Sequence, residues 1–190
     1  MTFMQRCNFS FSFAALLLVM CATAMGTTLE RISLTRMSQT ATLIVRARCL
    51  ENSTGWDAGE IWTLTSFRIE EVWRGSAPPR ITVRLLGGRA GILTSSISGV
   101  PRFRAGEEVI LFLEPTPRGD YSIVSWEQGT FRIHSQLHPA QESVTQDTAS
   151  FATFDPATRR FAAVGIRDLP VETFRAAVET ALQNDSGRKQ

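Results

Sequence analysis

The chain contains few of the residues that most often carry catalytic chemistry. Its 190 residues include three cysteines, two histidines, one tyrosine and one lysine. A metal centre or an imidazole-activated nucleophile would have to be assembled from this small set. We therefore expect no catalytic residue, cofactor or metal ion unless these few side chains converge in the fold.

The chain also lacks a cluster of charge of one sign. Nineteen of the twenty basic residues are arginines, they are spread among eighteen acidic residues, and no basic run is longer than two residues, as at Arg159-Arg160. A nucleic-acid interface needs basic side chains gathered on one face, so we expect no nucleic-acid partner. With 43% apolar and 20% charged residues, the composition is that of a globular domain.

A long apolar run occurs only near the N-terminus. Residues Phe9 to Met20 are almost continuously apolar, follow Arg6, and precede Ala22-Thr23-Ala24, which has the small residues that a signal peptidase recognises. The run is too short for a comfortable transmembrane span. We predict a signal peptide over residues 1–24, cleavage after Ala24, and a secreted or periplasmic protein.

Cysteine use fits export of a domain without disulfides. Only Cys49 remains after the predicted cleavage, so stability has to come from packing. Cys21 supports an alternative, a lipoprotein with a lipid anchor on that residue. Met20 is larger than the residue that usually precedes a lipidated cysteine, which favours the cleaved form.

Hydrophobic alternation with a period of two indicates strands through the middle of the chain. We predict strands at 43–50, 61–73, 81–86, 109–113, 121–126 and 130–133. The last two are expected to form a closing hairpin, residues 52–60 a turn, and residues 87–106 a long irregular segment. These features predict a mainly β fold, a small antiparallel OB-like barrel over residues 25–134.

Two helices and a short hairpin flank this region. Ser33 is a good N-cap for a short helix over 33–40, and Asp168 is one for a C-terminal amphipathic helix with Pro170 in its first turn. Residues 135–150 are polar and predict a loop, and 151–154 and 161–166 predict a hairpin around Asp155-Pro156. We expect residues 135–190 to pack on the barrel.

Three segments carry a family resemblance. Residues 41–47 (ATLIVRA), 67–75 (FRIEEVWRG) and 103–113 (FRAGEEVILFL) resemble strands and turns of netrin-like domains, the OB barrels that include the tissue inhibitors of metalloproteinases. They are closer still to uncharacterised secreted bacterial proteins with the same segments. The resemblance covers about half the chain and implies fold more than function. Those inhibitors chelate zinc through an N-terminal cysteine, whereas the predicted mature chain begins at Met25, so the resemblance implies no inhibitory residue here.

The two histidines are the first candidates for chemistry. His134 and His138 are spaced i, i+4, which on a helix would place two metal ligands on one face. The residues before His134 predict a strand, however, and in an extended chain the rings would lie about 13 Å apart. This argues against a shared metal ion.

The other candidates have plainer interpretations. Cys49 lies on the apolar face of a strand, which predicts a buried, inert thiol. Residues 87–91 (GGRAG) lack the Lys-Ser/Thr pair of a phosphate loop, and residues 94–99 lack the elbow of a serine hydrolase. Glu107 and Glu108 should point to opposite faces of a strand. The tryptophans predict core or rim positions: Trp56, Trp62, Trp73 and Trp126.

The sequence therefore favours an exported, non-catalytic binding or accessory module. Its partner is expected to be another extracytoplasmic protein, contacted through residues 87–106 and 135–150, since long segments in a compact domain are often functional. Two alternatives are a protease inhibitor that works without amine chelation and, less favoured, a hydrolase that uses His134 or His138.

Overall fold

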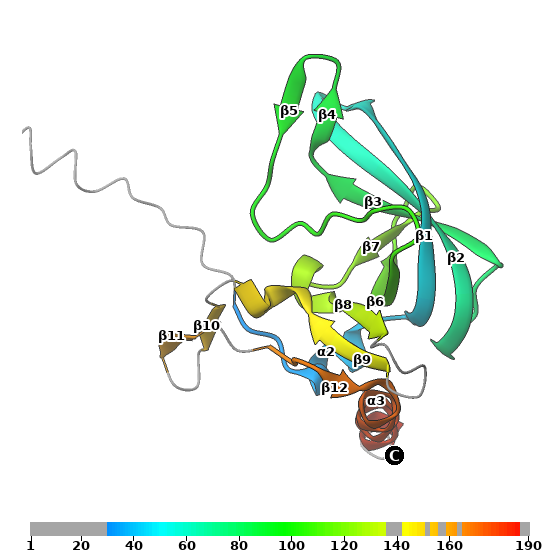
Figure 1. Ribbon diagram of the computed structural model, residues 1–190, viewed down its shortest axis with the longest axis vertical. Coiled ribbons are helices and arrows are strands. Elements are labelled where there is room, and N and C mark those ends of the chain that lie inside the picture. Colours follow the sequence, from blue (N-terminus) through cyan, green and yellow to red (C-terminus); the bar gives the residue numbers. More distant parts are fainter. Residues whose placement is uncertain (1–29, 136–141, 151–152, 156–158, 163–164, 187–190) are drawn as a thin grey trace, which may run out of the picture.

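Strands dominate the structure, a computed structural model that describes residues 30–135, 142–150, 153–155, 159–162 and 165–186 (Figure 1). The predicted signal peptide, Cys21 and His138 lie outside these residues. The helices are α2 (Leu34–Thr40), α3 (Val171–Ser186) and the 3-10 turns η2 (Trp126–Gly129) and η3 (Asp147–Ser150). The strands are β1 (Leu43–Asp57), β2 (Glu60–Arg74), β3 (Arg80–Leu86), β4 (Gly88–Ala90), β5 (Leu93–Ser95), β6 (Glu108–Pro115), β7 (Tyr121–Ile123), β8 (Thr130–Ser135), β9 (Glu142–Gln146), β10 (Thr153–Asp155), β11 (Arg160–Ala162) and β12 (Leu169–Pro170).

Eight of these strands form one mixed sheet. Its order is β1-β2-β3-β7-β6-β8-β9-β12, and β1 also pairs with β6. The pairing of β3 with β7 is parallel, at Val83 and Tyr121, so the expectation of a purely antiparallel sheet is wrong at this point. Strands β4 and β5 form a separate hairpin, as do β10 and β11.

The predicted turn over residues 52–60 is wrong. Strand β1 continues to Asp57 and β2 begins at Glu60, so only Ala58 and Gly59 turn the chain, both with positive φ (50° and 85°). Two-residue turns of this kind match the twist of the strands that they join. Gly55, which suggested a turn, lies within the ladder opposite Trp62.

The predicted hairpin between 121–126 and 130–133 is also wrong. Strands β7 and β8 both pair with β6, but on opposite sides of it. The chain crosses from one side to the other through η2, where Ser125 and Trp126 adopt left-handed φ of 51° and 54°. The crossing ends at Gly129, whose backbone lies close to the carbonyl oxygen of Val124. A Cβ at this position would collide with that oxygen, so only glycine fits here.

Two segments predicted to be irregular contain strands. In 135–150, β9 pairs with β8 and buries Val144 and Gln146, although the stretch has too few apolar residues to show alternation. In 87–106, the short strands β4 and β5, of three residues each, form a hairpin that turns at Gly91 and Ile92. The predicted hairpin of 151–154 and 161–166 is confirmed as β10 and β11, but residues 165 and 166 are not in a strand.

The sheet separates two hydrophobic cores. Alternate residues of β1 and β6 point to opposite sides: Val45 and Leu111 join the first core with Phe67, whereas Ile44 and Phe112 join the second, beneath the helices. Strand β6 is buried on both faces over Val109–Leu113, as its continuous apolar sequence predicts. The strand predicted from the period-two pattern of residues 43–50 is thereby confirmed as part of β1.

Helix α3 covers the second core. It buries Val171, Phe174, Val178 and Ala181, and the Phe174 ring lies 4.5 Å from that of Phe131. Two expectations for its start are wrong: α3 begins at Val171, directly after β12, so Asp168 is not its N-cap and Pro170 lies before its first turn. Ser33 does cap α2, accepting from the N–H of Arg36 at 3.2 Å. Neither helix described here has the length and apolar content needed to cross a membrane.

Replacing Phe174 should destabilise the whole domain. Phe174→Ala removes a fully buried ring that contacts Phe112 and Phe131, so we expect urea unfolding to show a loss of about 3–5 kcal/mol. Gln183→Ala, at an exposed position of the same helix, should change the free energy of unfolding by less than about 0.5 kcal/mol. Equal losses in the two variants would contradict the packing described.

Candidate functional site

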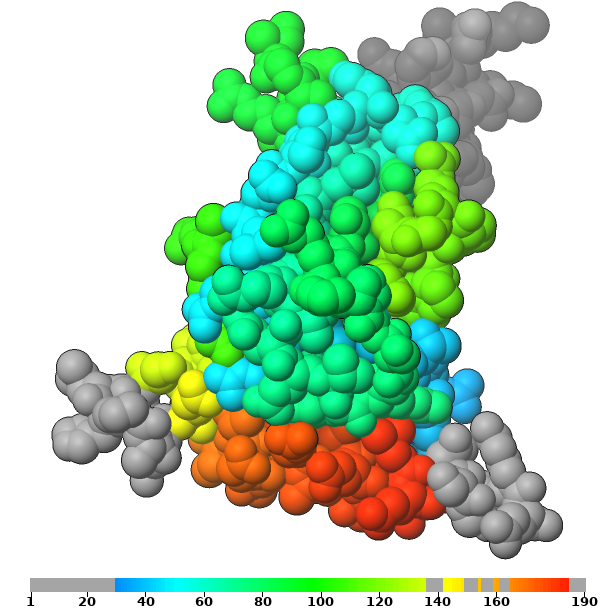
Figure 2. Space-filling view, turned by 90° about the vertical axis from the view of Figure 1, so that its right-hand side faces the viewer, coloured from blue at the N-terminus to red at the C-terminus, as the bar shows by residue number. Residues whose placement is uncertain are grey.

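The hairpin of β4 and β5 projects from the end of the molecule opposite helix α3 (Figures 1 and 2). Its tip carries Ile92, which is 95% exposed, and Leu93, which is 52% exposed. Trp56, near the β1–β2 turn, is 58% exposed. In a protein whose other large apolar side chains are mostly buried, this end stands out as a candidate contact surface.

A cavity of about 370 Å³ lies at the base of the hairpin, and we call it the hairpin cleft. Strands β1 and β2 contribute its polar side, with Asn52, Thr54 and Thr63. These groups are fixed by hydrogen bonds: the Asn52 amide donates to the carbonyl of Phe103 at 2.9 Å, and the Thr63 hydroxyl to that of Gly87 at 2.7 Å. The wall they form is therefore largely preformed.

The other side of the hairpin cleft comes from the segment 87–106. Arg89, Thr94, Ser96 and Arg102 supply polar groups, and Phe103 joins Leu85 as an apolar floor. The Phe103 ring packs edge-on against Phe67 at 5.0 Å, which ties the floor to the first core. Residues from a predicted contact segment thus line more than half of the cavity.

Gly88 allows the β4–β5 hairpin to pack closely against strands β1 and β2. Its φ is 141°, and an added Cβ would lie 2.5 Å from the methyl carbon of Thr54 and against the Thr63 hydroxyl. Residues 88–90 form a strand paired with β5, so the glycine-rich GGRAG sequence serves close packing. The structure places Arg89 on the exposed side of this strand, as the sequence indicates.

A second cavity, of about 300 Å³, lies beside the β1–β2 turn. Two arginines line it: Arg84 pairs with Asp57 at 2.8 Å and Asp120 at 2.7 Å and lies over the Trp62 ring, and Arg118 pairs with Asp57 at 2.5 Å. Burial by itself would lower the pKa of Arg84. The hydrogen bonds and negative charges of Asp120 and Asp57 have a larger effect than burial, so the pKa is raised. Both arginines of this cavity are therefore paired with carboxylates of the protein.

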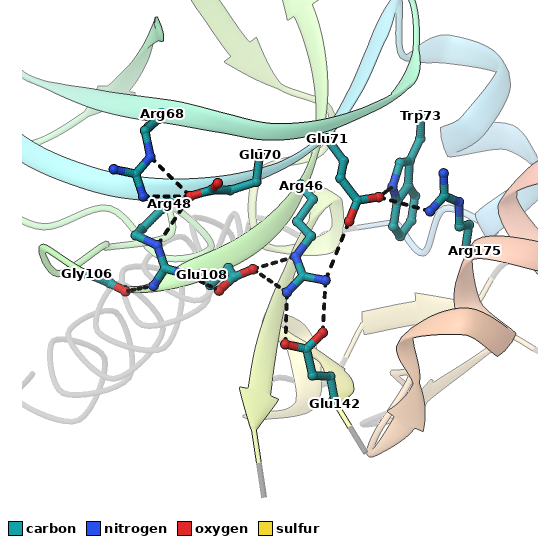
Figure 3. A network of polar contacts seen from close by, with 10 residues as sticks. All are labelled: Arg46, Arg48, Arg68, Glu70, Glu71, Trp73, Gly106, Glu108, Glu142 and Arg175. Carbon is teal, nitrogen blue, oxygen red and sulfur yellow. Dashed lines mark hydrogen bonds and ion pairs between the residues drawn. The ribbon is translucent and has the colours of Figure 1, made fainter. Parts of the chain in front are cut away.

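A third polar feature is a network of arginines and glutamates on the face of β1 and β2 (Figure 3). Arg46 is at its centre and contacts Glu108, Glu142 at 2.9 Å and Glu71 at 3.7 Å. Four arginines meet five glutamates in this network; its other members are Arg48, Arg68, Arg175, Glu70 and Glu179.

This network links elements distant in sequence. Arg46 of β1 reaches Glu108 of β6 and Glu142 of β9, while Glu71 of β2 reaches Arg175 of α3 at 2.9 Å. Burial lowers the pKa of Arg46, but hydrogen bonds with Glu142 and Glu108 outweigh burial and raise it. A guanidinium held in this way binds the strands together rather than taking part in proton transfer.

Glu107 and Glu108 have separate partners, as their strand positions predict. Glu108 contacts Arg46 and Arg48, whereas Glu107 accepts from Arg132 at 2.7 Å. Arg132 also pairs with Asp147 at 2.5 Å and lies over the Phe103 ring. The two carboxylates do not form an acid–base pair.

Only one of the two histidines lies within the described residues. His134 lies on β8 with an exposed side chain, and His138 falls outside the described residues. Within the described ranges, no hydrogen bond joins the His134 ring to another residue, and no three His, Cys, Asp or Glu side chains are placed to hold a metal ion.

Cys49 is a buried thiol, as the sequence predicts. It is 1% exposed and packs in the first core. Burial, and then the charge of Glu107, raise its pKa, so the nucleophilic thiolate is disfavoured. Of the tryptophans, Trp62 and Trp73 lie half-buried under Arg84 and Arg175, Trp126 is half-buried against the first core, and Trp56 is exposed.

Glu127 is an unusual group that sequence reasoning missed. It follows the two left-handed residues of η2, and its Oε2 atom is buried without a hydrogen bond from any described residue. Burial and the nearby charge of Asp147 raise its pKa, and Arg132 only partly offsets them. Nothing in the residues around Glu127 signals this, because its environment comes from η3 and β8, which are distant in sequence.

Comparison with models of protein families found no match to the chain. A search of curated proteins likewise found no relative. The function therefore has to be argued from the geometry of the site.

Removing the central cation of the network should destabilise the protein. Arg46→Met leaves Glu108, whose side chain is 15% exposed, with Arg48 alone and Glu142 without an ion-pair partner among the described residues, and we expect unfolding in urea to show a loss of about 3 kcal/mol. Arg68→Met removes a 54% exposed arginine from the same network and should cost less than about 1 kcal/mol. Similar losses would show that Arg46 is no more than a surface charge.

Glu127 should make stability fall as the pH rises. Because its pKa is raised in the folded protein, the native state holds the proton over a range of pH in which the unfolded chain has lost it, and stability declines across that range. Glu127→Gln should therefore raise the free energy of unfolding at pH 7 by about 1 kcal/mol, with the gain disappearing near pH 4. Glu114→Gln, at an exposed site, controls for loss of one carboxylate. A gain independent of pH would contradict the assignment.

Proposed function

We propose that this chain is an exported, non-catalytic binding module that contacts an extracytoplasmic protein through the β4–β5 hairpin and the hairpin cleft. The observation that carries the proposal is the exposure of Ile92 and Leu93 at the tip of a projecting hairpin. Large apolar side chains in such a position cost solubility unless a partner covers them.

The position of the cleft supports the same assignment. It lies directly at the base of the hairpin and is lined by Arg89, Thr94 and Ser96 of that segment. An apolar anchor beside a cavity with polar groups is the usual composition of a contact site, in which the anchor gives affinity and the polar groups orientation.

The fold part of the proposal is an OB-like barrel. Strands β1, β2, β3, β7 and β6 pair in succession, and β1 pairs again with β6 through Leu43–Arg48. Five strands whose pairings return to the first are typical of that barrel. This pattern supports the fold that the resemblance to netrin-like domains implies. The apolar run at 9–20 supports export, and removal of residues 1–24 is part of the proposal.

A non-catalytic role fits the chemistry of the described residues. The carboxylates of the ion-pair network are matched by arginines, and Cys49 is buried with a raised pKa. The alternatives of an inhibitor without amine chelation and of a hydrolase using His134 or His138 gain no specific support from the geometry.

A pull-down comparison tests the contact surface. The wild type, the double variant Ile92→Ser/Leu93→Ser and Val72→Ser are used as baits in culture fluid or periplasmic extract of the source organism. Val72 is 40% exposed on β2 and serves as the matched control. The double variant should recover at least fivefold less partner, because it removes the apolar anchor, while Val72→Ser should recover as much as the wild type.

The baits must first be shown to be folded. All three positions are exposed, so thermal unfolding should agree to within about 2 °C. Undiminished recovery by a folded double variant would overturn the assignment of the hairpin as the contact surface.

A further inference from the structure

We infer that the hairpin cleft binds a carboxylate attached to an apolar group, an inference that deepens the proposed function and rests on it. The cleft is large enough for a small ligand, since its volume of about 370 Å³ falls within the range of ordinary small-molecule sites. Its charge, its hydrogen-bond donors and its floor each restrict the chemistry of the occupant.

The charge of the cleft is positive and uncompensated. Its lining includes Arg89 and Arg102 and no acidic residue. Residues 87–106 as a whole contain three arginines and no aspartate or glutamate, in a chain whose charges otherwise nearly balance. Among the described residues, neither Arg89 nor Arg102 has an ion-pair partner. In contrast, Arg84 of the second cavity has two.

The donors of the two arginines are only partly used. The Arg89 Nε–H donates to the carbonyl of Gly91 at 3.3 Å, and one Arg102 terminal nitrogen to that of Ser95 at 3.1 Å. Each guanidinium carries five N–H groups, so donors remain for an anionic ligand. Both arginines line the cleft together with Thr94 and Ser96, whose hydroxyls are further donors.

The floor requires an apolar portion next to the anionic group. Leu85 and Phe103 are 4% and 6% exposed, and what they present to the cavity is hydrocarbon. A fully hydrated ion would leave this floor uncovered. A carboxylate on an aliphatic or aromatic body satisfies both parts of the site, because guanidinium pairs well with planar carboxylates.

The same geometry favours carboxylate over phosphate. Phosphate sites built on glycine-rich segments use several successive backbone N–H groups or a helix N-terminus. Here Gly88–Ala90 are in a strand paired with β5, and no helix begins between residues 87 and 106. The carboxylate can belong to a free small acid or to the C-terminus of a partner peptide, and the two sources share one recognition chemistry.

Titration of the purified protein with matched probes tests the inference. The probes are 3-phenylpropionate, its neutral amide 3-phenylpropanamide, and phenyl phosphate, followed by amide chemical shifts in two-dimensional NMR. We expect 3-phenylpropionate to bind with a Kd on the order of 1 mM and to shift amides of residues 88–103. The amide and the phosphate should each bind at least fivefold more weakly.

Variants locate the site. Arg89→Gln and Arg102→Gln should each weaken 3-phenylpropionate binding at least fivefold, whereas Arg104→Gln, in the same segment but outside the lining, should leave it unchanged. All three positions are exposed, so the variants should fold. Equal effects of the three variants would mean that net charge, and not the cleft, attracts the ligand, and would overturn the inference.

Two peptides distinguish the sources. N-acetyl-Leu-Phe with a free C-terminus and its C-terminal amide are compared in the same titration. If the free acid of the peptide binds tenfold more tightly than 3-phenylpropionate, the ligand is a peptide terminus. If it binds more weakly than 3-phenylpropionate, the ligand is a small acid. No binding of either acid at 20-fold excess over the expected Kd would refute the carboxylate site. In that case, reduced recovery of the partner by the Ile92→Ser/Leu93→Ser variant would still support the hairpin as the contact surface. The two proposals can therefore be refuted independently.

Discussion

The double pairing of strand β1 is the constraint on which the structure depends. Its first half, Leu43–Arg48, is bonded to β2 on one edge and to β6 on the other, so neither edge is open. Because side chains alternate along a strand, this one segment supplies Val45 to one core and Ile44 to the other. A shift of register by one residue would exchange the two sets, with Arg46 turned into the first core. The ion-pair network around Arg46 therefore reinforces the register that the hydrophobic pattern requires.

The arginines divide into two groups according to their surroundings. Those on the body of the sheet, such as Arg46, Arg84 and Arg132, are held by two or more carboxylates each and join segments that are distant in sequence. Those at the hairpin, Arg89 and Arg102, contact only backbone carbonyls among the described residues. The net charge of the chain conceals this difference, because both groups are counted together.

Much of the fold could be predicted from the sequence, because strong alternation and good caps are local signals. Strands β2, β3 and β6, helix α2 and the buried state of Cys49 were predictable in this way. Strand β9 was not, since it gains its stability from pairing with β8 and not from its own apolar content. The parallel pairing of β3 with β7 was also hidden, because it joins Val83 to Tyr121, which are distant in sequence, and no local pattern signals such a pairing.

The candidate site could be predicted only as a segment. The length of 87–106 indicated a contact surface, but the hairpin cleft needs Asn52, Thr54 and Thr63 from β1 and β2, which the sequence assigned to a turn and a strand with no link to that segment. The continuation of β1 to Asp57 is what carries these polar side chains beneath the hairpin.

The way in which the hairpin is attached has a consequence for sequence variation. It is seated at its base, through the close approach of Gly88 to Thr54 and the bond from the Gly87 N–H to the Ile61 carbonyl at 2.6 Å, while its tip points away from both cores. Residues at the tip can therefore be exchanged, or the loop lengthened, without disturbing the folding of the rest. Such an arrangement lets the sequence of the tip vary independently of the residues that stabilise the two cores.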